Sequence, residues 1–294
     1  RESQSWIKNK EYPAVTAKIV ILGSVPGNKS TMAIINSVLS WLIKKRMHQI
    51  ELFIKYPHEV QSEWFKRLIS AAKETEWGKK YDYSSIDSVE AFKERVPINT
   101  YENLKPYIDK LRNGMQNILW PTEIKWFAKS SGTTTEKSKY IPVSQEALEE
   151  CHFKAGKDML SLYFNNFPNP GIFDGRGLGI GGSHKISEYS NTSYYDGDLS
   201  AILIHNLPIW AEFIRVPKRS TALMDKWEDK IDRMAEETIP HNVTNLSGVP
   251  SWTLLLLKRV IEKTGKDNIL EVWPNLEVYF HGGVNFAPYR EQFA

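Results

Sequence analysis

A short apolar segment that runs directly into a long polar loop constrains the fold of this chain more than any other feature. Glu123–Ala128 has the character of a β-strand, and residues 129–139 after it have the composition of a loop. From Ser130 to Lys139 the loop offers hydroxyl groups, a glycine and two lysines, which are the donors and cations that a polyphosphate requires. The sequence therefore predicts a ligand-binding loop at the end of a strand.

An alternative interpretation of this loop is an ordinary solvated connection between two strands. A run of serines and threonines alone would favour that interpretation. Two features of the order favour phosphate binding instead: the strand Trp126-Phe127-Ala128 enters the loop directly, and Lys137 and Lys139 come at its end. The loop is therefore the first candidate site of the chain.

The spacing of apolar residues in the rest of the chain predicts an α/β protein of layered sheets and packed helices. Helices are expected over residues 32–47, 57–72, 101–111, 145–164, 210–214, 221–237 and 251–263. A buried strand is expected at Leu276–Phe280, and the six glycines of residues 171–183 suit twisted strands or tight turns. The residues expected to be buried in the last helix are Leu254, Leu255, Leu257 and Val260.

Composition narrows the class of protein. With 294 residues, of which 41% are hydrophobic, the chain can bury a core without disulfides or metals. A formal net charge of +3 with scattered basic residues argues against a nucleic-acid partner. The single cysteine, Cys151, rules out an intrachain disulfide and predicts a reducing, cytoplasmic setting.

Other patterns argue against three further classes of protein. The longest apolar run, Met32–Ile43, is too short to span a membrane, so no membrane partner is predicted. The histidines show no zinc-ligand spacing, so no metal ligand is predicted within the chain, and no G-x-S-x-G segment indicates a serine hydrolase. The sequence gives no indication of an oligomeric state.

A second candidate phosphate loop lies near the N-terminus. Lys18–Thr31 has the pattern of a strand followed by a near match to the G-x-x-x-x-G-K-[ST] loop, in which Gly23 and Lys29 are correctly separated. Asn28 occupies the second glycine position, where the backbone must fold tightly around the phosphates. A P-loop-like NTPase that uses residues 23–31 is therefore the alternative from a different class.

Several segments, in the same order along the chain, resemble one known family. They are Phe92–Tyr101, Phe127–Thr134, Lys139–Pro142, Gly248–Trp252 and His281–Tyr289. The polar loop resembles that of the acyl-adenylate-forming superfamily, which includes luciferase and the acyl-CoA synthetases. The other segments narrow the resemblance to the Gretchen Hagen three family of auxin-responsive acyl-acid amido synthetases, in particular its bacterial branch. The resemblance covers residues 32–294 and only the N-terminal portion of that family.

This resemblance implies a fold, a reaction and substrates. The fold would be the large N-terminal domain of an acyl-adenylate-forming enzyme, present here in incomplete form. The reaction would be ATP-dependent activation of a small-molecule carboxylic acid as an acyl-adenylate, followed by transfer to an amine, such as an amino acid, to form an amide. ATP and magnesium are the implied cofactors. An acyl-CoA ligase would show the same loop, and a catalytically inactive nucleotide-binding fragment is a further alternative.

The resemblance also implies roles for individual residues. The phosphates are assigned to Ser130, Ser131, Gly132, Thr133, Thr134 and Lys139, with Lys139 as the catalytic cation and Lys137 as an alternative phosphate contact. Adenine is assigned to Gly282, Gly283 and Val284, for which a simple turn is the alternative interpretation. The candidates for the carboxylic-acid pocket are Ser251, Trp252 and Leu255, for which ordinary core packing is the alternative.

The chain departs from the superfamily pattern in two respects. Thr135-Glu136 stands where a glycine is common, and the lysine comes one residue late. The family's Ser-Glu pair, which helps to hold magnesium, should follow soon after Tyr289, so the magnesium ligands are expected outside this chain. The predicted organisation is a leader, vector or other upstream sequence over residues 1–31 and a truncated N-terminal adenylate-forming domain over residues 32–294, without the C-terminal domain.

Overall fold

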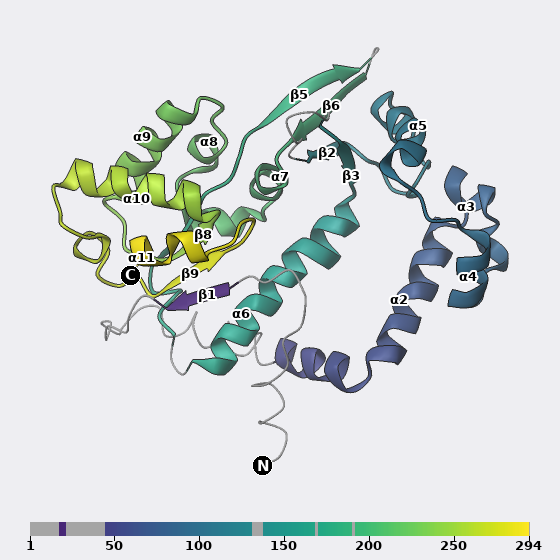
Figure 1. Cartoon of the computed structure of the whole chain (residues 1–294), viewed down its shortest axis with the longest axis horizontal. Coiled ribbons are helices and arrows are strands. Elements are labelled where there is room, and N and C mark those ends of the chain that lie inside the picture. The colour runs from purple at the N-terminus through teal and green to yellow at the C-terminus, as the bar shows by residue number, and fades with distance from the viewer. Residues whose placement is uncertain (1–17, 22–44, 131–137, 168–169, 190–191, 294) are drawn as a thin grey trace.

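The computed structural model describes residues 18–21, 45–130, 138–167, 170–189 and 192–293, which form two mixed sheets with helices around them (Figure 1). The strands are β1 (Lys18–Ile21), β2 (Trp126–Lys129), β3 (Tyr140–Val143), β4 (Arg176–Gly179), β5 (His184–Tyr189), β6 (Thr192–Gly197), β7 (Arg215–Val216), β8 (Val243–Gly248) and β9 (Val278–His281). The α-helices are α2 (Pro57–Ala72), α3 (Glu76–Lys80), α4 (Val89–Arg95), α5 (Tyr101–Arg112), α6 (Lys154–Asn166), α7 (Leu199–His205), α8 (Arg219–Ala222), α9 (Trp227–Thr238), α10 (Pro250–Thr264) and α11 (Arg290–Phe293), together with a helix over residues 45–55. Short 3-10 helices cover Tyr83–Ser85, Ile209–Phe213, Ile269–Glu271 and Ala287–Tyr289, and a π-helix, Ala147–Phe153, leads directly into α6.

The larger sheet has the strand order β1-β9-β8-β4-β7. Strands β9, β8, β4 and β7 run parallel, and β1 pairs antiparallel with β9 at one edge. In β9, Tyr279 packs toward α9 and α10, whereas Val278 and Phe280 pack toward α6, so the strand is buried on both faces. Because parallel strands all end at the same edge, the segments that follow β4, β8 and β9 come together there.

The smaller sheet has the order β3-β2-β6-β5 and carries the polar loop. Strands β2 and β3 form the antiparallel hairpin on which the loop stands, and β2 also pairs in parallel with β6. Phe127 and Tyr194 face α5, whereas Ala128 faces Ile202 of α7. Strand β2 is therefore packed on both faces and supports the loop rigidly.

The helices begin and end where the sequence provides suitable residues. Pro57 lies in the first turn of α2, and Asn103 Oδ1 accepts a hydrogen bond of 3.0 Å from the backbone N–H of Thr100 at the start of α5. Pro250 lies in the first turn of α10, which ends at Gly265 with a φ of +65°. Helices α2 to α5 gather on one side of the molecule, away from α8, α9 and α10 (Figure 1).

The predicted α/β class is confirmed, but several predicted elements need correction. The single helix expected over residues 221–237 is wrong: α8 ends at Ala222, where the backbone N–H of Leu223 turns back to the Thr221 carbonyl, and α9 begins at Trp227. Of the helix expected at 210–214, residues 210–213 belong to the 3-10 helix Ile209–Phe213. The helix expected from residue 145 begins there, but its Ala147–Phe153 segment is a π-helix.

Burial on α10 also differs from the prediction: Leu254 is only half-buried, and Leu256, which was not predicted to be buried, is fully buried. Leu255 was expected in the core but is 50% exposed, whereas its neighbours Leu256 and Leu257 are buried. Of the helix expected over residues 32–47, residues 32–44 lie outside the described part, and residues 45–47 are helical. In the part of the chain that the structure describes, no helix has the length and apolar character needed to cross a membrane.

Candidate functional site

Two hydrogen bonds close the base of the polar loop. The backbone N–H of Ser130 donates to the carbonyl oxygen of Lys139 at 3.0 Å, and the backbone N–H of Lys139 donates to Ser130 Oγ at 3.2 Å. These two residues, which we call the loop neck, face each other at the ends of β2 and β3. The predicted phosphate contacts Ser131, Gly132, Thr133, Thr134 and Lys137 lie outside the described residues, so their roles stay predictions.

Helix α5 supports the loop neck. The backbone N–H of Tyr140 donates to the hydroxyl of Tyr101, the first residue of α5, at 2.9 Å. Lys139 Nζ lies 5.8 Å from the centroid of the Tyr101 ring, within the range of a cation–π contact. The predicted catalytic lysine is therefore held through its backbone by the hairpin and lies with its ammonium group over α5.

Two further cations lie beside the loop neck, and neither was singled out from the sequence. Lys129 Nζ forms an ion pair with Asp196 Oδ2 of β6 at 2.6 Å. The guanidinium carbon of Arg112 lies 4.0 Å from the centroid of the Tyr140 ring, and Arg112 donates to the Tyr194 hydroxyl. Lys129 could have been identified from the sequence, because it directly precedes the loop. Asp196, Arg112, Tyr140 and Tyr194 are distant in sequence and come together only in the folded protein.

Burial and pairing with Asp196 have opposite effects on the pKa of Lys129. Burial lowers the pKa of Lys129, but the hydrogen bond and charge of Asp196 outweigh this effect, and the pKa is raised overall. The Asp196 side chain is fully buried, and that of Lys129 is 28% exposed. Because a buried carboxylate is costly without a partner, the charged ammonium of Lys129 is needed to offset it.

The carboxyl ends of three parallel strands form a second part of the site. We call it the glycine edge; it consists of Gly181 and Gly182 after β4, Gly248 at the end of β8, and Gly282 and Gly283 after β9. Among the described residues, apart from Gly282 and its two chain neighbours, no atom lies within 4 Å of the position that a Cβ of Gly282 would take. Gly283 has a φ of +82°, a backbone conformation that residues with side chains rarely adopt. A flat ligand can approach the backbone here, and the predicted adenine residue Val284 is exposed next to it.

The predicted acid-pocket residues lie at the start of α10, directly after Gly248. Ser251 and Trp252 are both half-buried. The ring of Trp252 packs against that of Trp227 on α9, with centroids 4.7 Å apart. The structure therefore brings Ser251 and Trp252 to the glycine edge, whereas Leu255 lies one turn further along the helix with half of its surface in solvent.

A buried lysine that the sequence analysis did not identify holds one segment of the glycine edge. Lys230 of α9, only 1% exposed, donates from Nζ to the carbonyl oxygens of Gly181 at 2.7 Å and Gly182 at 2.9 Å. Burial lowers the pKa of Lys230 to about 8, against the opposing charges of Asp198 and Asp225. Lys230 therefore fixes the backbone that follows β4.

The segment Asp196–Asp198 connects the loop neck with the glycine edge. Asp196 pairs with Lys129 beside the neck, and the carboxylate of Asp198 occupies the space that a side chain on Gly182 would need. The backbone N–H of Gly182 also donates to Ser200 Oγ at 3.0 Å. Figure 1 shows α7, which starts directly after this segment, lying between β2 and α8. The two parts of the site therefore share one rigid junction.

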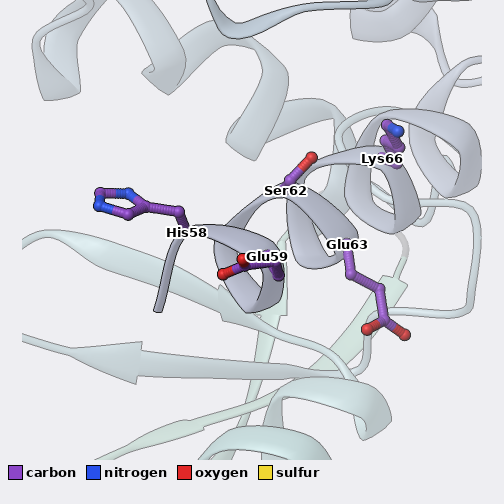
Figure 2. A pocket seen from close by; sticks show the side chains of 5 residues that line it. All are labelled: His58, Glu59, Ser62, Glu63 and Lys66. Carbon is purple, nitrogen blue, oxygen red and sulfur yellow. The ribbon is translucent and has the colours of Figure 1, made fainter. Parts of the chain in front are cut away.

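A depression on α2 is separate from this site. It has a volume of about 540 Å³ and is lined by His58, Glu59, Ser62, Glu63 and Lys66. Figure 2 shows that all five side chains come from one helix, and all five are exposed. We assign it no role, because a single solvated helix face encloses no ligand. Within the described residues, no group of three or more His, Cys, Asp and Glu side chains could hold a metal ion.

Comparison with known proteins gives matches over most of the chain. Residues 46–294 match the model of the GH3 family N-terminal domain. An Arabidopsis thaliana protein named indole-3-acetic acid-amido synthetase GH3.2 is 31% identical over 137 residues, which are 46% of this chain and 24% of that protein. A Nicotiana attenuata protein named jasmonoyl-L-amino acid synthetase JAR6 is 30% identical over 107 residues, 36% of this chain and 18% of that protein.

Solved structures share the fold. A structure of GH3.15 acyl acid amido synthetase superposes with a TM-score of 0.60 and 20% identity, covering 85% of this chain and 41% of that chain. A structure of AtGH3.15 acyl acid amido synthetase in complex with 2,4-DB gives a TM-score of 0.61 and 19% identity, covering 76% of this chain and 38% of that chain. The chain thus spans less than half the length of the relatives that it matches.

Proposed function

The chain belongs to the GH3, or Gretchen Hagen three, family, and from this premise we propose that it acts in acyl-acid amido synthesis. ATP would activate a carboxylic acid as an acyl-adenylate, and an amine would then take the acyl group to form an amide. The observation that carries the proposal is the loop neck, where Ser130 and Lys139 are fixed at the mouth of a hydroxyl-rich loop. The names of the relatives, which are amido synthetases, support an amide as the product.

In the first half-reaction, the protein must position the two substrates and offset the negative charge that develops on the phosphates. A carboxylate is ionised at neutral pH, so its attack on the α-phosphorus of ATP needs no general base. The new bond forms between the carboxylate oxygen and the α-phosphorus while the bond to pyrophosphate breaks. Ser130 and the hydroxyl residues after it would hold the β- and γ-phosphates, and Lys139 would offset the charge that develops on the leaving pyrophosphate.

In the second half-reaction the amine nitrogen bonds to the acyl carbon, and the bond from that carbon to the AMP oxygen breaks. AMP leaves with its negative charge, and the nitrogen releases a proton. We propose that adenine lies along Gly282, Gly283 and Val284, where the backbone is open to a flat base. We further propose that the acid lies beside Ser251, Trp252 and Leu255 at the start of α10.

The finer parts of the proposal rest on sequence arguments. When bound, magnesium would offset the charge of the phosphates, and we propose from the family resemblance alone that its ligands lie outside this chain. The single cysteine supports a cytoplasmic setting, and the resemblance of the loop supports a place in the bacterial branch. The organisation into a leader over residues 1–31 and an adenylate-forming domain over residues 32–294 remains part of the proposal.

Acid-dependent ATP–pyrophosphate exchange tests the first half-reaction. Labelled pyrophosphate entering ATP is measured on the full-length protein, with a panel of aromatic and alkyl acids that includes indole-3-acetic acid, the acid named for a relative. We expect exchange with at least one acid and none without acid. Mass spectrometry after addition of amino acids should then show an amide and AMP. A coenzyme A thioester instead of an amide would indicate an acyl-CoA ligase, and no exchange with any acid would contradict the proposal.

Replacing Trp252 with alanine is expected to raise the KM for the acid about tenfold and to leave the KM for ATP unchanged, because the proposed position of the acid is against the Trp252 ring. Steady-state exchange kinetics with each substrate varied in turn measure the two constants. Leu256→Ala is the matched control, because Leu256 is fully buried on the same helix and contacts the core. Equal changes in both constants, with a lower Tm in both variants, would favour a role of Trp252 in core packing alone.

A further inference from the structure

The connection between β2 and β6 continues past the end of their backbone pairing. The last register pair of the two parallel strands is Ala128 with Gly197. One residue further along β2, the ammonium group of Lys129 lies 2.6 Å from the carboxylate of Asp196. The ion pair therefore fixes the last residue of β2, immediately before the loop neck, to the neighbouring strand.

Burial makes Asp196 an effective anchor. Its side chain is 0% exposed, so in the closed pair solvent does not compete with Lys129 for the carboxylate. The ion pair between Lys110 and Glu76 has the same length of 2.6 Å, but its side chains are 41% and 38% exposed. Exposed pairs of that kind contribute little to rigidity because solvent competes for both charges.

The opposite strand of the hairpin is held from α5. Tyr140 is the register partner of Lys129, and the Lys129 ammonium lies 5.5 Å from the centroid of the Tyr140 ring. Arg112 lies over the same ring, and Tyr101 accepts the Tyr140 backbone N–H. The two strands that end in the loop neck are therefore fixed on one side to β6 and on the other to α5.

We propose that Asp196 is a positioning residue for the loop neck and acts through Lys129. By holding the end of β2, Asp196 keeps Ser130 and Lys139 at the separation that receives the β- and γ-phosphates of ATP. Asp196 itself contacts no substrate. The identity of the ligand rests on the proposed function, whereas the control of the loop neck by Asp196 is a property of the protein without ligand.

Hydrogen–deuterium exchange of the ligand-free protein tests the structural part. Asp196→Asn keeps the shape of the side chain and removes its charge. We expect the backbone amides of Ser130, Lys139 and Tyr140 to exchange about tenfold faster in this variant, while those of α10 are unchanged. Glu76→Gln, which breaks the exposed pair of equal length, should leave the loop neck unchanged. Unchanged exchange at the loop neck in Asp196→Asn would overturn the inference, whether or not the protein binds ATP.

Exchange kinetics test the consequence for the nucleotide. Asp196→Asn is expected to raise the KM for ATP about tenfold and to leave the KM for the acid unchanged, because the loop neck serves the phosphates. Lys129→Arg, which keeps a cation, should retain a KM for ATP close to that of the wild type. Equal rises in both constants would overturn the positioning role.

A double-mutant cycle tests whether Asp196 acts through Lys129. If it does, Asp196→Asn and Lys129→Met combined should raise the KM for ATP no further than the worse single variant, since the two residues form one unit. Additive effects would overturn the inference. Lys129→Met alone leaves the charge of Asp196 buried without a partner and can fail to fold. In that case the double variant, which removes both charges, is compared with Asp196→Asn alone. If the proposed function is wrong, the wild type itself will show no acid-dependent exchange. That outcome is distinct from a failure of the positioning role, in which the wild type is active.

Discussion

Replacing Lys139 with alanine is expected to lower acid-dependent ATP–pyrophosphate exchange by about 100-fold to 1,000-fold, the usual loss when one preorganised donor is removed from a developing charge. In the proposed reaction, Lys139 offsets the charge on the departing pyrophosphate. The two hydrogen bonds of the loop neck use only the backbone of Lys139, so the variant should keep the hairpin and its Tm. Exchange rates and thermal unfolding of the two proteins measure both expectations.

Lys137→Ala is the matched control for this prediction, because the two lysines lie in the same loop and the sequence alone leaves either as the phosphate contact. We expect a much smaller loss of exchange in Lys137→Ala than in Lys139→Ala. The reverse order of losses would transfer the role to Lys137. Wild-type exchange in Lys139→Ala would contradict the role of the loop neck in catalysis.

The elements that could be predicted are those whose signal is local. Helix α10 has a proline in its first turn, a helical apolar pattern and a glycine directly after its end, and β9 begins with the hydrophobic residues Val278, Tyr279 and Phe280. Even in α10, the four successive leucines from Leu254 to Leu257 point to different sides of the helix, so the sequence does not show which side is buried. The pattern therefore predicted the helix correctly but placed Leu255 in the core. Which of the leucines are buried depends on how α10 packs on the sheet.

The elements that were missed depend on distant partners. Strands β5 and β6 form a hairpin rich in polar residues, and Ile186 is 64% exposed, so their sequence carries a weak strand signal. Strand β8 lies in a segment to which the sequence analysis assigned no strand, although it stands between β9 and β4 in the larger sheet. Sheet membership of this kind arises from pairing with strands far along the chain.

The same distinction holds for the candidate site. The polar loop and Lys139 could be identified because their residues are consecutive and resemble those of a known family. Asp196 and Lys230 gave no signal, because each is a charged residue in an ordinary stretch of sequence. Only the fold buries them and supplies Lys129 to the first and two backbone carbonyls to the second.

Lys230 provides the second large expected effect, a pH dependence of stability. Burial lowers its pKa to about 8 from an ordinary value of 10.5, and the charges of Asp198 and Asp225 oppose this only in part. His184, whose charge also interacts with Asp225, has its pKa lowered by burial, against the opposing charge of Asp225. Between the folded and unfolded pKa values of Lys230, the unfolded chain holds a proton that the folded chain has lost. The free energy of unfolding therefore rises with pH in this window, and this stabilisation is lost as the pH falls through the folded value.

Lys230→Met removes this contribution, so the difference in unfolding free energy between wild type and variant should grow by about 2 kcal/mol from about pH 7.5 to about pH 10. The neutral amine explains the direction: it still has two N–H groups for the carbonyls of Gly181 and Gly182, and it no longer buries a charge. Urea unfolding of both proteins across this range measures the difference, and the titration of all other groups cancels. A constant difference for Lys230→Met would mean that burial does not lower the pKa of Lys230 in the folded protein.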